Sequence, residues 1–202
     1  MDPPKLDPLP SSFYDRPVLG LARALVGKIL VHATPDGIAA GRIVETEAYR
    51  GPEDLAAHSA NGRRTKRTEA MFGPAGRAYM FLLYGTSWAF NVTAGALDHP
   101  HAVLVRALEP LVGHDLMARR RSLTPERREL TNGPGKLCQA LALDRSHYGA
   151  CLVSSPLFIS DGISGKVGRS PRINIDYAGV WAQRDWRFYE RDNRYVSVAP
   201  RS

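Results

Sequence analysis

The sequence predicts an α+β fold, with a single compact domain around a curved, mostly antiparallel β-sheet, flanking helices and a projecting β-hairpin. Strand-like segments outnumber helical ones and mostly come in pairs joined by short turns, as is typical of antiparallel sheets. The 202 residues are 44% hydrophobic, with no internal repeat or linker, and this length suits one sizeable core. We therefore expect one domain over residues 12–202. Residues 1–11 contain four prolines and are expected to form a flexible arm.

A helix and a β-hairpin are expected directly after the arm. Pro17 suits a first helical position, an apolar stripe at helical spacing runs as far as Val26, and Gly27 is a stop signal. Two strand-like runs follow, at residues 28–34 and 38–49, with Pro-Asp-Gly between them. A turn sequence of this kind between two such runs predicts a hairpin.

A second hairpin and several shorter elements are expected in the rest of the chain. The hairpin has strands at residues 78–84 and 87–92, with Gly85 and Thr86 in its turn. The other expected segments are helices at residues 65–71, 113–121 and 134–143 and strands at residues 102–108, 157–160, 172–175 and 195–198.

The charge of the chain is compatible with nucleic acid as a partner. The net charge is +7 and the pI about 9.7, and only five of the 27 basic residues are lysine. Arginine makes planar, bidentate contacts to phosphate, although a high pI is also common in proteins that bind no nucleic acid. No run approaches the roughly 20 apolar residues that a membrane-spanning helix needs, so we expect no membrane partner.

The cysteines and the first residues indicate an intracellular protein without structural metal. Cys138 and Cys151 are too few for a disulfide framework and form no CxxC pair. The first ten residues, MDPPKLDPLP, lack the basic start and the apolar stretch of a secretory signal. The expected location is the cytoplasm or nucleoid in a bacterium and the nucleus in a eukaryote.

Two carboxylates and an aromatic ring share one face of the strand expected at residues 38–49. Alternation places Glu45, Glu47 and Tyr49 together, with the intervening residues on the opposite face. The face could be a solvated outer surface. It could instead hold a general base beside a stacking ring, or a divalent-metal pair that would suit a nuclease.

Three segments have the composition of contacts to a phosphate backbone. NGRRTKR, at residues 61–67, contains Arg63 and Arg64, and GKVGRSPR, at residues 165–172, contains Lys166 and Arg169. Glycine allows close approach and arginine supplies charge without reading sequence. The glycine-rich entry to the helix expected at residue 134, with Lys136, could hold one phosphate. Solvated charge runs and an ordinary helix start are the structural alternatives.

An aromatic residue is expected at the tip of the second hairpin. Tyr84 directly precedes Gly85, and a ring at a hairpin tip is a poor core residue but a good wedge between base steps. With the basic segments, Tyr84 could therefore serve a non-catalytic DNA-bending module.

Several blocks of sequence together resemble one enzyme family. They are GRIVETEAYRGPEDLAAHS (41–59), AYMFLLYG (78–85), LVRALEP (104–110), GPGKLCQAL (133–141) and RFYERDNRYVSV (187–198). In this order they resemble the alkyladenine DNA glycosylases of the mammalian type, also called 3-methyladenine or methylpurine DNA glycosylases. The resemblance runs from about residue 21 to the end of the chain.

The resemblance implies a monofunctional DNA repair enzyme. Such an enzyme flips a damaged purine out of duplex DNA and hydrolyses its N-glycosidic bond, leaving an abasic site without cutting the backbone. By position, Glu47 matches the general base of the family, and Arg106 matches the arginine that helps to hold the attacking water. The implied partner is double-stranded DNA with damaged purines, and the implied state is a monomer that needs no cofactor.

The resemblance also implies the residues that bind the base. Tyr49 and His58 match the residues that pack one face and the edge of the flipped base, and Asn91 matches the asparagine of the pocket floor. Tyr84 matches the wedge that fills the vacated space. Phe81 stands at the opposite stacking position, where the vertebrate members have tyrosine, so the stacking area is kept and the hydroxyl is lost.

Overall fold

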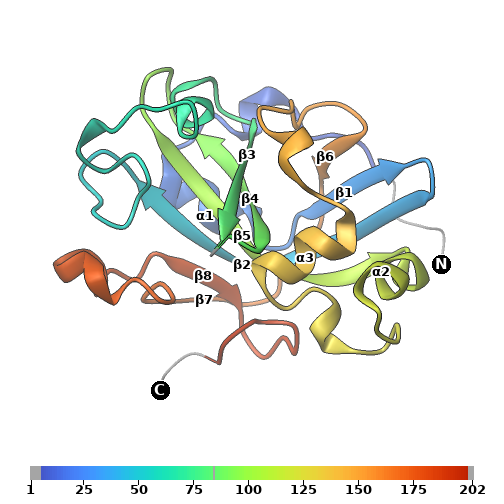
Figure 1. Ribbon diagram of the computed structural model, residues 1–202. Helices are drawn as coiled ribbons and strands as arrows, with labels where there is room; N and C mark the ends of the chain where they lie inside the picture. Colours follow the sequence, from blue (N-terminus) through green and yellow to red (C-terminus); the bar gives the residue numbers. More distant parts are fainter. Residues whose placement is uncertain (1–5, 84, 200–202) are drawn as a thin grey trace.

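The computed structural model describes residues 6–83 and 85–199, in which helices flank an antiparallel sheet of eight strands (Figure 1). The strands are β1 (Ile29–Thr34), β2 (Gly37–Arg50), β3 (Ala78–Leu83), β4 (Ser87–Ala94), β5 (His101–Val112), β6 (Leu157–Ser160), β7 (Val167–Ser170) and β8 (Arg187–Glu190). The α-helices are α1 (Val18–Leu25), α2 (His114–Arg121) and α3 (Pro134–Leu141). The 3-10 helices are η1 (Ser11–Phe13), η2 (Ala60–Gly62), η3 (Glu69–Phe72), η4 (Arg128–Leu130), η5 (Arg145–His147) and η6 (Asp176–Trp181).

The long strand β2 is the centre of the sheet. The strand order is β3-β4-β5-β2-β1-β6, and β8 also pairs with β2 and carries β7. Every one of these pairs is antiparallel. Because β5 and β8 both pair with β2 around Glu45, opposite Ala107 and Tyr189, three strands meet where the sequence carries its paired carboxylates. The predicted α+β class is confirmed.

Alternation along the strands separates a core face from a second face. Val103 and Val105 of β5 and Phe90 of β4 lie in the main hydrophobic cluster with Leu21 of α1 and Leu137 of α3. The residues between them along β4 and β5 point the other way, toward the long connections at residues 51–77 and 171–186. The helices therefore cover one face of the sheet, and connecting segments cover the other.

The first helix and the first hairpin match their predictions closely. α1 begins at Val18, with Pro17 as its N-cap, and ends at Leu25. The chain turns at Gly27, which has a φ of 92°. A Cβ on Gly27 would lie 2.5 Å from the Ser164 nitrogen, so this position needs glycine for its close approach as well as for its backbone angle.

Three of the sequence predictions need correction. The part of the arm at residues 6–11 is bound to the sheet, because Pro8 bridges Ser160 and the Leu9 N–H donates to the Ile159 oxygen at 2.8 Å. No strand forms at residues 172–175 or 195–198 in the described structure, whereas β7 and β8 form nearby. Short apolar runs separated by turns do not distinguish which run pairs with β2. The helix expected at residues 65–71 is reduced to η3.

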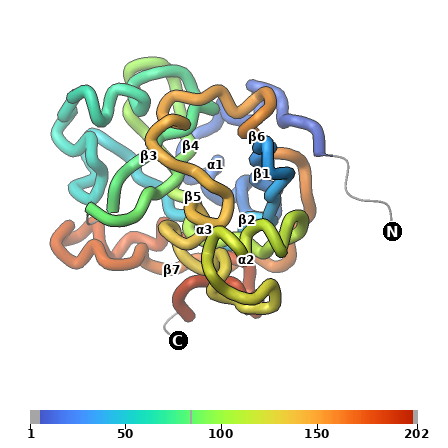
Figure 2. Tube along the Cα trace, turned by 45° about the vertical axis from the view of Figure 1, so that its right-hand side comes forward, coloured from blue at the N-terminus to red at the C-terminus, as the bar shows by residue number. Residues whose placement is uncertain are grey.

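The last described segment, residues 191–199, lies beside the connection that follows α2 (Figure 2). Arg194 Nη2 donates to the Glu126 oxygen at 3.1 Å, and the Ser197 N–H donates to Glu45 Oε2 at 2.6 Å. The end of the chain thus supplies a backbone donor to a carboxylate of β2, 152 residues away in sequence.

Candidate active site

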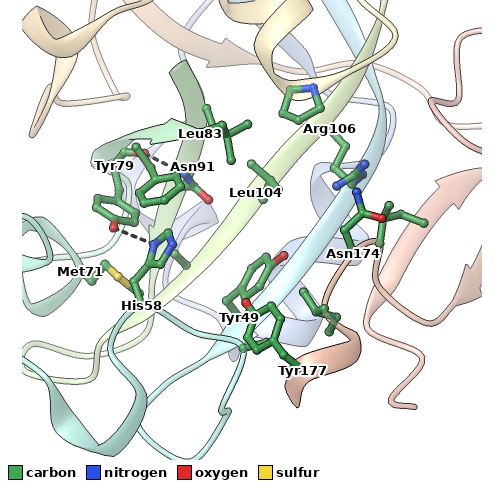
Figure 3. Close-up of a pocket in the computed structure, with 17 residues that line it drawn as sticks. Tyr49, His58, Met71, Tyr79, Leu83, Asn91, Leu104, Arg106, Asn174 and Tyr177 are labelled. Atoms are coloured by element: carbon green, nitrogen blue, oxygen red, sulfur yellow. Dashed lines mark hydrogen bonds between the residues drawn. The ribbon is translucent and has the colours of Figure 1, made fainter. Parts of the chain in front are cut away.

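A hollow of about 440 Å³ lies on the second face of the sheet. It is here called the base pocket, after the flipped base that the resemblance implies. Its volume falls in the range of about 300–1,000 Å³ that is usual for small-ligand sites. Figure 3 shows His58, Tyr79 and Asn91 on one side of it, Tyr49 and Tyr177 on another, and Arg106 with Asn174 on a third. β2 to β5 form the floor, and the segment at residues 173–177 closes part of the wall.

Glu47 lies immediately behind this pocket and is fully buried. Its Oε2 accepts hydrogen bonds from the Tyr49 hydroxyl at 2.8 Å and from Arg106 Nη1 at 3.3 Å, and its Oε1 accepts from the Ile173 N–H at 2.7 Å. Tyr49, Arg106 and Ile173 all line the pocket. The Glu47 carboxylate is therefore held directly behind the pocket wall by hydrogen bonds from three residues that line the pocket.

Glu45 is the centre of a buried charge network. Its Oε1 accepts from Arg106 Nε at 3.0 Å, from Arg187 Nε at 2.7 Å and from the Ser197 hydroxyl at 2.9 Å. Glu45, Glu47 and Arg187 are at most 1% exposed, and Arg106 is 8% exposed. Two carboxylates and two guanidinium groups thus form a neutral set of four, called here the charge quartet. Burial of these charges is tolerable because each one is paired and hydrogen-bonded.

The ring of Tyr49 is fixed on its far side and at its hydroxyl. The Arg172 guanidinium carbon lies 4.7 Å from the ring centroid, and Arg172 is itself bound to Asp54 through contacts of 2.5 and 2.9 Å. Burial, together with the negative charge of Glu47, raises the pKa of Tyr49 well above its usual value. The phenol is therefore a hydrogen-bond donor at neutral pH, and Tyr49 lines the pocket.

His58 is fixed in a similar way on the opposite wall. Its Nδ1 lies 2.9 Å from the Tyr79 hydroxyl, and its ring lies 3.8 Å from that of Phe81, tilted by 31°. Desolvation by these neighbours, with a smaller contribution from the positive Arg67, lowers the pKa of His58 to about 4. His58 is thus neutral at physiological pH and adds no positive charge to the pocket.

Phe81 differs from its expected role as the second stacking face. The Arg67 guanidinium carbon lies 4.0 Å from the Phe81 centroid, and the His58 ring lies 3.8 Å from it. Two groups so close to one ring must occupy its two faces, because they would collide on the same face. In this structure Phe81 therefore backs His58, and the imidazole has the free ring face toward the pocket.

Asn91 lies on the floor of the pocket with its amide held in place. Its Nδ2 donates to the backbone oxygen of Tyr79 at 2.9 Å, across the β3–β4 pair, and the residue is 7% exposed (Figure 3). Its position therefore cannot shift without loss of a hydrogen bond within the sheet. Asn91 is therefore a rigid polar group on the pocket floor.

The structure brings six predicted residues together around the pocket and leaves others outside it. The six are Glu47, Arg106, Tyr49, His58, Phe81 and Asn91. Tyr84 lies outside the described residues. The exposed Lys166 lines a different hollow, beside α1.

The remaining predicted backbone contacts differ in how far their charge is already used. Arg64 forms ion pairs with Glu69 at 2.6 Å and with Asp98 at 2.8 Å, whereas the exposed Arg63 forms none with a described carboxylate. Lys136 donates to Asn132 Oδ1 at 2.8 Å, near the start of α3 at the pocket rim. Arg169 is exposed on β7. These contacts stay predictions, with Arg64 the weakest of them.

Sequence reasoning missed four residues that build the site. Arg187 completes the charge quartet, Arg172 with Asp54 supports Tyr49, and the Ile173 N–H binds Glu47. Arg187 stands in the block RFYERDNRYVSV, directly before Phe188 and Tyr189, and an arginine next to two large apolar residues is a signal of a buried charge partner. No comparable signal marks the other three.

The carboxylate pair has arginine where a metal ion would lie. Arg106 contacts both Glu45 and Glu47, at 3.0 and 3.3 Å, and a guanidinium in that position would repel a divalent cation. Among residues 6–83 and 85–199, no group of three or more His, Cys, Asp and Glu side chains is placed to hold a metal ion. The donor chemistry therefore does not favour the metal-dependent nuclease.

Comparison with known proteins identifies the chain. Residues 12–194 match the profile of the family described as methylpurine-DNA glycosylase. The chain is 48% identical over 195 residues to a Bacillus licheniformis protein, covering 96% of this chain and 98% of the other, and 48% identical over 194 residues to one from Bacillus subtilis, covering 95% and 97%. A Methanocella arvoryzae protein is 44% identical over 191 residues, covering 94% and 95%. All three carry the name "Putative 3-methyladenine DNA glycosylase".

These matches and the fold define a DNA glycosylase, a hydrolase of N-glycosyl bonds that serves DNA repair. Within that class, the chain belongs to the methylpurine-DNA glycosylase family. The relatives compared are bacterial and archaeal, so the membership is of the family as a whole and is not specific to the mammalian type. No helix in the described part of the chain has the length and apolarity needed to cross a membrane.

Proposed function

We propose that this enzyme excises alkylated or deaminated purines, of the 3-methyladenine, 7-methylguanine and hypoxanthine class, from duplex DNA. The observation that carries the proposal is the buried Glu47, bonded to Tyr49 and Arg106 directly behind the base pocket. A base inside a duplex is unreachable, so the damaged nucleotide must be flipped into the pocket. The product is an abasic site in an uncut backbone, and the enzyme acts as a monomer inside the cell.

Tyr49 and His58 would bind the flipped base. Each ring has one face backed, by Arg172 and Phe81 respectively, and a polar atom held by a hydrogen bond. Stacking of a base on an aromatic ring contributes about 1–3 kcal/mol, and a base made cationic by alkylation gains further attraction to the Tyr49 ring. Rings that are already fixed lose little entropy when the base enters.

Glu47 would act as the general base. Glycosidic cleavage builds an oxocarbenium-like sugar, which a nearby carboxylate stabilises while it takes a proton from the attacking water. Because Glu47 itself is covered, the water must enter at the junction of Tyr49 and Arg106, which both line the pocket. Arg106 would orient this water and at the same time hold the Glu47 carboxylate in place through its Nη1. None of these steps uses a lysine amine, so no Schiff base and no strand cleavage are expected.

The test is single-turnover excision by Glu47→Gln on duplexes with one hypoxanthine or one 7-methylguanine, in EDTA. At a temperature well below the Tm of the variant, we expect the rate to fall at least about 100-fold, the usual scale for loss of a general base, with duplex binding nearly intact. Glu126→Gln is the matched control, because Glu126 is exposed and lies outside the pocket. Free base and broken backbone are measured separately.

The same experiment separates the rival functions. A Glu47→Gln rate within a few-fold of the wild type would show that Glu47 is not the base. Backbone breaks that require added Mg²⁺ would indicate a nuclease. Binding without any release of base from either duplex would indicate a DNA-bending module.

A further inference from the structure

A second hollow, of about 770 Å³, lies on the helical side of the sheet. One wall is α1 with the residues that flank it, and the other is the segment at residues 164–167 with Arg191. The Thr46 hydroxyl donates to the Ala22 oxygen of α1 at 2.8 Å, whereas Glu45 and Glu47, on either side of Thr46, point to the opposite face. The two hollows are therefore separated by the thickness of the sheet.

The lining of this hollow is basic and contains no acidic residue. Its cations are Arg16, Arg23, Lys28, Lys166 and Arg191. Lys28 is paired with Asp161 at 2.6 Å. The other four residues are exposed, and none of them forms an ion pair with a carboxylate in the described part of the chain. Four positive charges around one hollow thus have no ion-pair partner among residues 6–83 and 85–199.

The two walls are held at a fixed separation. A Cβ on Gly27 would lie 2.5 Å from Ser164 N, and a Cβ on Gly162 would lie 2.3 Å from Gly27 O, so the backbones of the two walls are in direct contact at the base of the hollow. A Cβ on Gly20 of α1 would meet nothing within 4 Å. The middle of the α1 wall is therefore open to a bulky ligand.

We propose that this hollow, the rear basic groove, binds the phosphodiester backbone of a second segment of DNA while the base pocket holds the first. Arginine-rich contacts suit phosphate, and the lining has no aromatic ring, Asn or Gln that would read a base. The binding is thus independent of sequence, and it lets one molecule contact two duplex segments. The proposal rests on the proposed function only for the identity of the first segment.

The test uses one immobilised undamaged duplex and a second, fluorescent duplex in solution. Wild-type protein should bring the fluorescent duplex to the surface. Arg16→Glu/Arg23→Glu should lower this bridging at least about 10-fold, with single-turnover excision within twofold of the wild type. Arg119→Glu/Arg128→Glu is the matched control, because it makes the same change in net charge at two exposed arginines outside the groove, and it should leave bridging unchanged.

Three results would overturn the proposal. They are no bridging by the wild type, equal bridging by the Arg16→Glu/Arg23→Glu protein, or an equal loss in the control. Loss of bridging with millimolar inorganic phosphate, but not with sodium chloride of matched ionic strength, would support contacts between the groove and the phosphate groups of DNA. Excision by the wild type and direct binding of the fluorescent duplex are measured in the same preparation. If the wild type excises the damaged base but does not bridge the two duplexes, the proposed function stands and only the proposal for the rear basic groove is refuted.

Discussion

Replacing Glu45 with Gln should lower the stability of the folded protein and should not abolish base excision. The Glu45 carboxylate accepts four hydrogen bonds, including one from each of Arg106 and Arg187. Gln keeps the size but leaves the charge quartet with one carboxylate against two guanidinium groups, and its amide nitrogen must face a donor. Breaking a buried pair in this way costs about 3–5 kcal/mol. For a chain of this length the expected fall in Tm is about 6–20 °C.

The assay is urea unfolding followed by circular dichroism, with calorimetry for Tm. Arg187→Met alone should also destabilise the protein, whereas Glu45→Gln with Arg187→Met should cost clearly less than the sum, because no charge is then left unpaired. Excision by folded Glu45→Gln, at a temperature well below its Tm, should exceed that of Glu47→Gln. A midpoint for Glu45→Gln equal to that of the wild type, or costs that add in the double variant, would refute the account of the charge quartet.

Three further predictions concern His58 and Asn91 of the pocket and the basic loop at residues 61–67. NMR titration should find that His58 in the folded protein is protonated only near pH 4. Because the unfolded chain binds this proton near pH 6.5, the contribution of His58 to stability is complete above pH 6.5 and is lost as the pH falls toward 4. A measured pKa near 6.5 would contradict the desolvation of the His58 ring. Asn91→Ser should raise the excision rate of 7-methylguanine relative to that of hypoxanthine about tenfold, equivalent to about 1.4 kcal/mol, because the smaller side chain leaves space for the 2-amino group of 7-methylguanine. The same variant should lose about 1 kcal/mol of stability with the lost hydrogen bond. An unchanged ratio of the two excision rates would leave Asn91 with a structural role only. Arg63→Ala should reduce the slope of log binding constant against log salt concentration for duplex DNA by about 0.9. Arg64→Ala should reduce this slope less, because Arg64 already forms ion pairs with Glu69 and Asp98. A larger effect of Arg64→Ala would show that these ion pairs break when DNA binds.

Local signals in the sequence predicted the parts of the site that lie on one strand. Alternation placed Glu45, Glu47 and Tyr49 on a common face, and the structure has all three on the side away from α1. The Pro-Asp-Gly turn predicted the β1–β2 pair, which is observed in a continuous register from Ile29 to Thr34. These features depend on residues close in sequence, so a short window contains the necessary information.

The burial of the same carboxylates could not be predicted, because their partners are distant. Arg187 reaches Glu45 across 142 residues, and the Ile173 N–H reaches Glu47 across 126. Without these partners, two glutamates on one face are more economically explained as a solvated surface. Phe81 illustrates the same limit, because only the position of Arg67 reveals that its second face is covered.

The charge quartet also restricts how the family can diverge. Glu47 serves the proposed chemistry, yet its neighbour Arg106 is shared with Glu45, and Glu45 in turn is bound to Arg187. A substitution at any one of the four passes through an unbalanced, destabilised protein. Change at these positions during evolution therefore requires paired substitutions. The four residues of the charge quartet should be inherited together even where the loops around the pocket vary freely.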